Sequence, residues 1–243
     1  MFIHLINASH TVNKHLNQHN IFLNLLSGIG YSPEKKLNIE IQRCLNIAVE
    51  YLQHQILENH TLGIRCLEEL IQEYPQSQQK VLEILTAFVR HNAPAKTPDE
   101  VKCMLSHKIH PDIQAALSII SKLDTDECLK DTQIDLSYTD LQGANLSAAN
   151  LAASNLYRVN LSGANLAGAN LSGAILSAAK LVGANLAGAN LSGAILSAAN
   201  LSEANLAKAN LVKANLYLAN LQQANLQEAN LDQANLREAK FSG

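Results

Sequence analysis

From residue 136 onward, the hydrophobic pattern of the chain repeats every five residues. A leucine falls at each fifth position from Leu136 to Leu236, and Phe241 occupies the next of these positions. The residue two places before each leucine is small or of modest size, usually alanine, and the residue between them is usually asparagine. This period fits neither an α-helix nor an alternating strand. It fits a coil whose short sides each turn one small and one large side chain inward.

A longer repeat of twenty residues is superimposed on the repeat of five. Residues 165–184 and 185–204 differ only at Lys180/Asn200, Val182/Ser202 and Gly183/Glu203. Twenty residues are four units of five, so one such repeat makes one turn of a four-sided coil. With coils spaced by about 4.8 Å, about five of them predict a rod on the order of 25 Å long.

The unit Ala-Asn-Leu-x-x resembles the signature of the pentapeptide-repeat family, in which alanine is followed by aspartate or asparagine, then leucine and two variable residues. The resemblance covers residues 132–243. It implies a right-handed quadrilateral β-helix, in which leucines stack as an interior ladder and backbone hydrogen bonds join successive coils. The ladder on one side of this fold would contain Leu146, Leu166, Leu186, Leu206 and Leu226.

Residues 1–131 have the apolar spacing of α-helices. Short connections between them favour an antiparallel bundle. Residues that favour helix ends predict the helix boundaries. One helix is expected to start at Ser32 and Pro33 and to end near Asn59, and later helices are expected to start at Thr61, Ser77 and Pro111. The fold class is therefore predicted as α plus β-solenoid, with an α-helical domain over 1–131 and a β-helix over 132–243.

Three segments of the helical domain resemble the region that precedes the repeats in other bacterial members of the family. They are Leu62–Leu70, Val81–Arg90 and Asp112–Leu117. This resemblance implies no defined activity. We expect the domain to cap the first coil by covering open backbone groups near Asp135.

One side of the coil is predicted to be apolar. When the outward residues are sorted by coil, this side carries Tyr138, Tyr157, Ile175, Ile195, Tyr217 and Leu218. Ile175 and Ile195 are one coil apart and should lie directly above one another. Contiguous exposed apolar surface is commonly a contact site. A second interpretation stays open, in which isoleucine raises strand propensity and the tyrosines are merely scattered.

Charge narrows the classes of partner. The chain of 243 residues has a net charge of -3, which gives no global attraction to nucleic acid or to an anionic membrane. Some members of the resembling family imitate DNA with an acidic rod and bind DNA gyrase. Residues 132–243 hold six acids and six bases, so this imitation lacks the charge it needs. Regulation of a topoisomerase by DNA mimicry stays an alternative hypothesis.

The sequence contains no recognisable catalytic constellation. His15 and His19 have a spacing that can share a metal, but no acidic or cysteine ligand accompanies them, so a polar helical face is favoured. Cys44 and Cys66 are expected to be buried rather than reactive. The repeats contain no histidine, which excludes a serine–histidine pair within them. We expect no catalytic residue, metal or cofactor, with an unrecognised enzyme site in the helical domain as the remaining alternative.

The resulting prediction is a non-enzymatic protein-binding or scaffolding module of the cytoplasm. No secretory signal pattern begins the chain, no apolar run reaches membrane-helix length, and the cysteines fit a reducing compartment. The expected partner is a protein held on the apolar side or by the helical domain. We also expect a homodimer through the last coil, because an uncapped β edge at Phe241 invites pairing.

Overall fold

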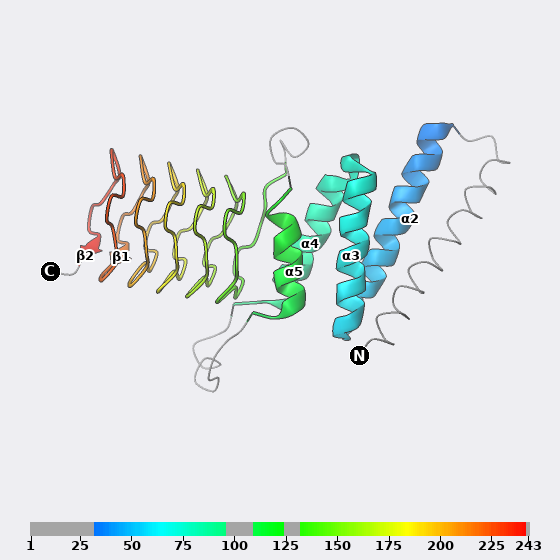
Figure 1. Ribbon diagram of the computed structural model, residues 1–243, viewed down its shortest axis with the longest axis horizontal. Helices are drawn as coiled ribbons and strands as arrows, with labels where there is room; N and C mark the ends of the chain where they lie inside the picture. Colours follow the sequence, from blue (N-terminus) through cyan, green and yellow to red (C-terminus); the bar gives the residue numbers. More distant parts are fainter. Residues whose placement is uncertain (1–31, 96–108, 124–131, 242–243) are drawn as a thin grey trace. The chain divides into compact units, whose positions relative to one another are not determined.

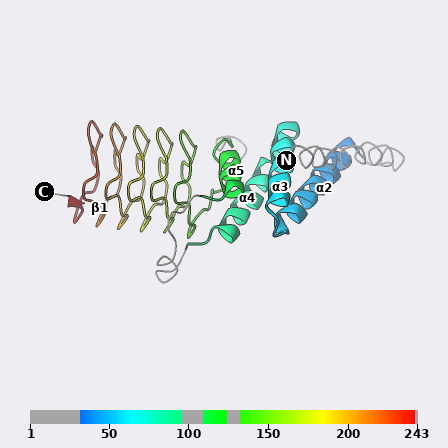
Figure 2. The same ribbon diagram turned by 60° about the horizontal axis from the view of Figure 1, so that its bottom comes forward.

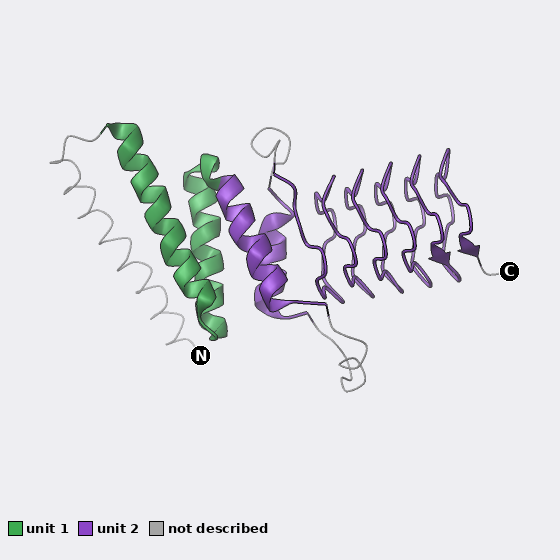
Figure 3. Cartoon of the chain, turned by 180° about the vertical axis from the view of Figure 1, so that it is seen from behind, with its two compact units in different colours: residues 1–77 green, residues 78–243 purple. Residues whose placement is uncertain are grey.

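The computed structural model of the chain describes residues 32–95, 109–123 and 132–241. They belong to two compact units, one within residues 1–77 and the other within residues 78–243 (Figure 3). The predicted change from helices to repeats at residue 132 is a change of secondary structure. The compact units divide earlier, before Gln78, so that two helices share a unit with the repeats.

The first unit contains the helices α2, Pro33–Gln53, and α3, Leu57–Glu73. Ser32 caps α2 as expected, because its side chain accepts a hydrogen bond from the amide of Lys35 at 3.3 Å. The predicted boundary near Asn59 and Thr61 is wrong, since both residues lie inside α3. Instead, His54 and Ile56 have extended backbone between the two helices, and the Thr61 hydroxyl donates to the Leu57 carbonyl at 3.1 Å within α3.

Close packing joins α2 to α3 at a glycine. A Cβ atom on Gly63 would lie 2.9 Å from the backbone oxygen of Ala48 and 2.9 Å from Cγ of Leu52, so a larger residue would push the helices apart. A short 3-10 turn, η1, Pro75–Ser77, follows α3. The Ser77 hydroxyl donates to the carbonyl of Tyr74 at 2.7 Å, which ties it to the end of α3.

The second unit begins with α4, Gln78–Asn92, and α5, Pro111–Ile120. Pro111 is the first residue of α5, as its fixed φ favours. The two helices contact each other, and their buried faces include Val81 and Leu85 from α4 and Leu117 and Ile120 from α5.

Residues 132–241 form a parallel β-helix whose coils are stacked in a row (Figures 1 and 2). Bridged positions recur every five residues and partners are twenty apart, so each coil has four sides. Bridges join residues twenty positions apart, such as Asn165 with Asn185, and at the last coil they extend into the parallel strands β1, Asn220–Leu221, and β2, Lys240–Phe241. The amide of Leu166 donates to the Asn185 carbonyl at 2.7 Å, and the amide of Asn185 donates to the Ala164 carbonyl at 2.9 Å. Repetition of these bonds holds each coil to the next.

Tight turns make the corners of the coil. The amide of Ala169 donates to the carbonyl of Leu166 at 3.0 Å, and Gly168 between them has a φ of 65°. A positive φ at the third residue is the mark of a type II turn, which favours glycine. The same position also holds residues with side chains, including Arg158 at 55° and Leu218 at 59°.

The interior is a stack of leucines and alanines. Leu146 is 2% exposed, and Leu166, Leu186 and Leu206 are fully buried. Burial of a leucine contributes about 1.5–3 kcal/mol before the entropy of ordering is counted. Leu226 is only half-buried, because it lies in the last coil that the structure describes.

Helical elements of the same unit cover the open edge of the first coil. In later coils, each amide in the asparagine position donates to the preceding coil. In the first coil, the amide of Asp140 donates to the Ala93 carbonyl at 2.8 Å and that of Asn150 to the Ser121 carbonyl at 3.1 Å. Gln114 of α5 bonds twice to Asn145, since its Oε1 accepts from the amide at 2.8 Å and its Nε2 donates to the carbonyl at 2.8 Å. Its side chain therefore imitates the backbone of a missing coil.

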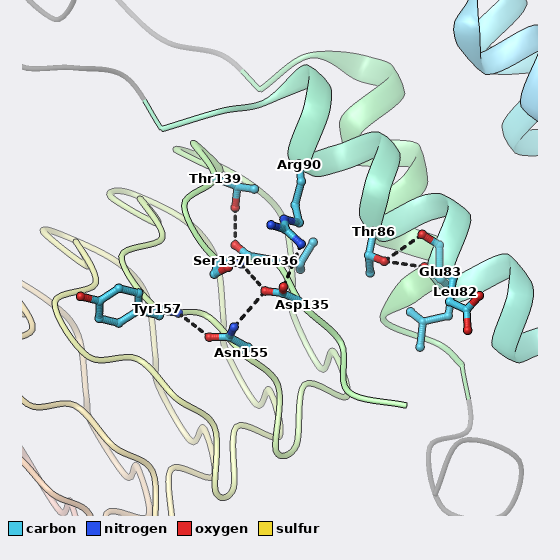
Figure 4. A network of polar contacts seen from close by, with 10 residues as sticks. All are labelled: Leu82, Glu83, Thr86, Arg90, Asp135, Leu136, Ser137, Thr139, Asn155 and Tyr157. Atoms are coloured by element: carbon cyan, nitrogen blue, oxygen red, sulfur yellow. Dashed lines mark hydrogen bonds and ion pairs between the residues drawn. The ribbon is translucent and has the colours of Figure 1, made fainter. Parts of the chain in front are cut away.

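An ion pair lies beside these bonds (Figure 4). Arg90 of α4 donates to Oδ2 of Asp135 at 2.8 Å. The other carboxylate oxygen of Asp135 accepts from the Ser137 amide at 3.0 Å and from Nδ2 of Asn155 in the next coil at 3.0 Å. The first aspartate thus accepts hydrogen bonds both from the helix and from the second coil.

Candidate functional site

The outward side chains of the β-helix lie in columns, because each residue stands above the residue twenty positions earlier. One side contains the predicted apolar residues, and we call it the tyrosine side. It consists of residues 135, 137 and 138 and their equivalents at steps of twenty, as far as residue 238. The bridges Asn155–Ile175, Ile175–Ile195 and Ile195–Asn215 set the order of its coils.

The six residues predicted for a contact face all occur on this side. Tyr138, Ile195 and Leu218 are 50%, 40% and 43% exposed, and the other three, Tyr157, Ile175 and Tyr217, are half-buried. The register places Ile195 directly on Ile175. Neighbouring coils therefore share an apolar surface that solvent reaches.

Aromatic and guanidinium groups gather at both ends of the tyrosine side. The rings of Tyr138 and Tyr157 meet edge to face with centroids 5.3 Å apart. The guanidinium of Arg158 lies 5.3 Å from the centroid of Tyr157 and 6.0 Å from that of Tyr138. At the other end, the guanidinium of Arg237 lies 6.0 Å from the centroid of Tyr217. Such contacts favour these ring orientations, by about 0.5–1 kcal/mol for each exposed cation–π contact.

Small residues separate these two ends. The column of Tyr157 continues through Ser177 and Ser197 to Tyr217. The neighbouring column runs from Arg158 through two alanines, Ala178 and Ala198, to Leu218. Large side chains thus stand on either side of two coils whose only large outward residues on this side are Ile175 and Ile195.

The two isoleucines interrupt a ladder of asparagines. On other sides, most asparagines bind their equivalent in the preceding coil, as Nδ2 of Asn185 donates to Oδ1 of Asn165 at 3.2 Å. On the tyrosine side, asparagine bonds of this kind remain at the ends, where Asn155 donates to Asp135 at 3.0 Å and Asn235 to Asn215 at 3.1 Å. The central coils replace these hydrogen bonds by apolar surface.

The described residues provide few groups for catalysis. Residues 32–95, 109–123 and 132–241 contain no cluster of three histidine, cysteine or acidic side chains that could hold a metal. Nδ1 of His110 lies 2.5 Å from Oδ1 of Asp112, but this oxygen also accepts from the Ile113 amide and is occupied at the start of α5. His15 and His19 lie outside the described residues.

The cysteines of the first unit are poorly suited to be nucleophiles. Burial raises the pKa of the Cys44 thiol and raises that of the Cys66 thiol to about 11, with nearby carboxylates adding to both shifts. A thiol with a raised pKa carries little thiolate at neutral pH. Both cysteines are free, and neither is fully buried.

The last coil leaves apolar groups open to solvent. Leu226, Leu231 and Leu236 are half-buried, and Phe241 is 45% exposed. Phe241 pairs with Leu221 of the preceding coil. Within the part of the chain that the structure describes, no backbone group accepts the amides of those three leucines. An end-to-end contact through this edge stays a prediction.

The sequence alone did not identify Arg158 and Gln114. A single arginine among many small residues attracts no notice, although alignment in steps of twenty places Arg158 beside Tyr157 and Tyr138. No periodic signal marks Gln114, because one glutamine on a helix resembles any solvated residue.

Among residues 32–95 and 109–123, no helix is long and apolar enough to cross a membrane.

The repeats match a known protein family. The model for pentapeptide repeats matches eight copies, over residues 132–166, 154–193, 184–223 and 214–243. This family is defined by its repeat, and no catalytic family is shown. None of the curated proteins compared with the chain matches it.

Solved structures of pentapeptide repeat proteins also match. Rfr23 from the cyanobacterium Cyanothece 51142 is 36% identical, with 44% of this chain and 66% of that chain covered and a TM-score of 0.26. HetL from Nostoc sp. strain PCC 7120, which is involved in heterocyst differentiation regulation, is 35% identical, with 44% and 63% covered and a TM-score of 0.20. The chain therefore spans slightly less than two thirds of either protein. A third, alr5209 from Nostoc PCC 7120, is 32% identical, with 45% and 86% covered and a TM-score of 0.24.

Proposed function

Because the chain belongs to the pentapeptide-repeat family, whose fold is a right-handed quadrilateral β-helix, we propose that it is a non-enzymatic module that binds a partner protein on its tyrosine side. The stacked pair Ile175 and Ile195 carries the proposal. Both occupy a position that holds asparagine in the coils on either side, Asn155 and Asn215. This apolar pair, in which Ile195 is 40% exposed, replaces a hydrogen-bonded ladder, and it suits a contact with another protein.

The surrounding tyrosines support the same role. Tyrosine combines a large apolar ring with a polar hydroxyl, and it is enriched at protein interfaces. Tyr157 and Tyr217 stand three coils apart in one column, a separation of about 14 Å at the usual spacing between strands. A partner surface placed between them would contact both rings and the isoleucines at once.

Affinity capture from a lysate of the source organism tests the proposal. The test variant combines Tyr157→Ser, Ile175→Asn, Ile195→Asn and Tyr217→Ser, each of which copies a residue from the same column. The control combines Val182→Ser and Val212→Ser, which remove apolar side chains from other sides and also copy residues of their own columns. We expect a protein captured by the native chain and the control to be lost from the test variant. Retention of every captured protein by the test variant would refute the proposal and direct attention to the helices.

The open last coil suggests a second contact, with another copy of the chain. We propose that two copies pair through the edge that contains Phe241, which would cover its exposed ring and the half-buried leucines beside it. Sedimentation equilibrium over a concentration series should show a dimer that Phe241→Ser weakens. A monomeric mass at every concentration would exclude this pairing.

DNA mimicry finds no support in the charges. Between Asp140 and Glu203 the chain contains no acid, so most of the rod offers no rows of carboxylates in place of phosphates. A gyrase supercoiling assay tests this alternative, and inhibition at low micromolar protein would favour it.

An enzyme site in the helices would be indicated by turnover in a broad substrate panel. The compartment that we propose is the cytoplasm, which the free thiols of Cys44 and Cys66 favour.

A further inference from the structure

Cations surround the apolar centre of the tyrosine side. Arg158 lies on this side itself, one coil before Ile175. Lys180 follows Ala178 around the corner of its coil, at one flank, and Lys213 precedes Asn215 at the opposite flank. All three side chains are exposed. They therefore stand around the isoleucine pair on three of its four edges.

On the tyrosine side itself, the only acids are Asp135 and Glu238, at its two ends. From residue 141 to residue 202 the only charged residues are Arg158 and Lys180. Glu203 is the next acid, and it lies on the neighbouring side, in the column of Gly163 and Gly183. The region around the isoleucines is therefore positive, although the whole chain has a net charge of -3.

The acids at the two ends already have partners. Asp135 binds Arg90 at 2.8 Å, and Glu238 lies 3.5 Å from Arg237. Within the described residues, neither Lys180 nor Lys213 forms an ion pair, and the contacts of the Arg158 guanidinium are with tyrosine rings. These three cations are available for carboxylates that arrive with a partner.

We infer that the partner of the tyrosine side is a protein segment whose centre is apolar and whose edges carry carboxylates. This inference rests on the proposed function, because it describes what that surface binds. Interfaces commonly have an apolar centre and a polar rim, and opposite charges in the rim select the partner and its orientation. A nucleic acid would satisfy the cations, but its phosphates would leave Ile175 and Ile195 without an apolar contact.

A library of random twelve-residue peptides, displayed on phage and selected on the immobilised full chain, supplies the probe. Selected peptides are then synthesised with a fluorescent label, and their affinity is measured by fluorescence polarisation. The rim variant combines Arg158→Ala, Lys180→Asn and Lys213→Gly, which copy Ala178, Asn160 and Gly193 of the same columns. Lys208→Gly, which copies Gly188 on another side, is the matched control for loss of a cation.

We expect the selected peptides to contain apolar residues flanked by aspartate or glutamate. Since exposed ion pairs are worth little individually, the three changes of the rim variant should weaken binding roughly tenfold, with no effect of the control. Raising the salt from about 50 to about 300 mM should also weaken binding to the native chain, because exposed charges are screened.

Three results would overturn the inference: selected peptides without an excess of acids, an affinity that the rim variant leaves unchanged, or no selection at all. Tighter binding of a DNA oligonucleotide than of any peptide, lost in the rim variant, would also overturn it in favour of nucleic acid. A variant with Ile175→Asn and Ile195→Asn separates the two proposals. If peptides lose affinity for this variant but not for the rim variant, the apolar contact stands and the charged rim does not; if neither variant matters, both proposals fail.

Discussion

Gln114 offers a sharp test of how the helices stabilise the first coil. Its amide makes two hydrogen bonds of 2.8 Å to the backbone of Asn145, one as acceptor and one as donor. Gln114→Ala removes both and leaves an amide and a carbonyl at the edge of the coil without a protein partner. A hydrogen bond contributes about 0.5–1.5 kcal/mol net, and water reaches this half-exposed site, so we expect a loss of about 1–2 kcal/mol.

Hydrogen exchange followed by NMR measures this loss where it occurs. Loss of about 1–2 kcal/mol should speed exchange of the Asn145 amide roughly 5- to 30-fold. The amide of Asn185, in the middle of the β-helix, should keep its protection. Gln114→Glu is the matched control, because its carboxylate still accepts from the Asn145 amide but no longer donates to the carbonyl. Because its second oxygen would face the Asn145 carbonyl oxygen where the donor was, it should destabilise this edge at least as much as alanine does.

The reasoning is refuted if Asn145 exchanges at the native rate in Gln114→Ala. The side-chain amide would then contribute nothing that water does not replace. An equal acceleration at Asn145 and Asn185 would instead mean that the substitution destabilises the whole unit and not the edge of the first coil.

Three further predictions concern the interior, the corners and the cysteines. Leu186→Ala should lower the free energy of unfolding by about 2–5 kcal/mol, and Leu226→Ala by clearly less, because Leu226 is only half-buried; equal shifts in urea midpoints would contradict this. Gly188→Val should cost about 1–2 kcal/mol from its φ of 65° alone, since a Cβ there meets no atom within 4 Å, and Gly188→Asn should cost less in the same urea titration. Cys66 should alkylate slowly at pH 8, with a rate that rises until about pH 11, and a rate that levels off near pH 9 would exclude the raised pKa. Because the folded pKa lies above the ordinary value of 9.0, the contribution of this thiol to stability is present below pH 9.0 and is lost toward pH 11.

The repeat made the β-helix predictable in detail. The leucine at every fifth residue must point into the interior, so the pattern alone indicates the coil, its four sides and the columns that bring Ile175 to Ile195. No single tertiary contact could change a structure that so many equivalent leucines favour. The tyrosine side could be predicted for the same reason, because it needs only the period of twenty.

The helical part was less predictable, since its boundaries depend on contacts. Thr61 has the properties of a helix cap, yet it lies inside α3, which already begins at Leu57. Gly63 looked unremarkable in sequence, although its missing side chain lets α3 approach Ala48 of α2. The ties from Ala93, Gln114 and Ser121 to the first coil use backbone atoms or a single amide, and neither leaves a pattern in the hydrophobic residues.

The twenty-residue coil also lets the number of coils set the distance between surface groups. Residues 165–184 and 185–204 are nearly identical, and each coil binds its neighbours through the same bonds, so one more copy could enter between them without disturbing either end. Every column would keep its register, and Tyr157 would move away from Tyr217 by one step of about 4.8 Å. Duplication or deletion of a coil thus changes the distance between surface groups in uniform increments while their identity and orientation stay the same. A protein built in this way can match the dimensions of its partner through the number of its coils, separately from the chemistry displayed on them.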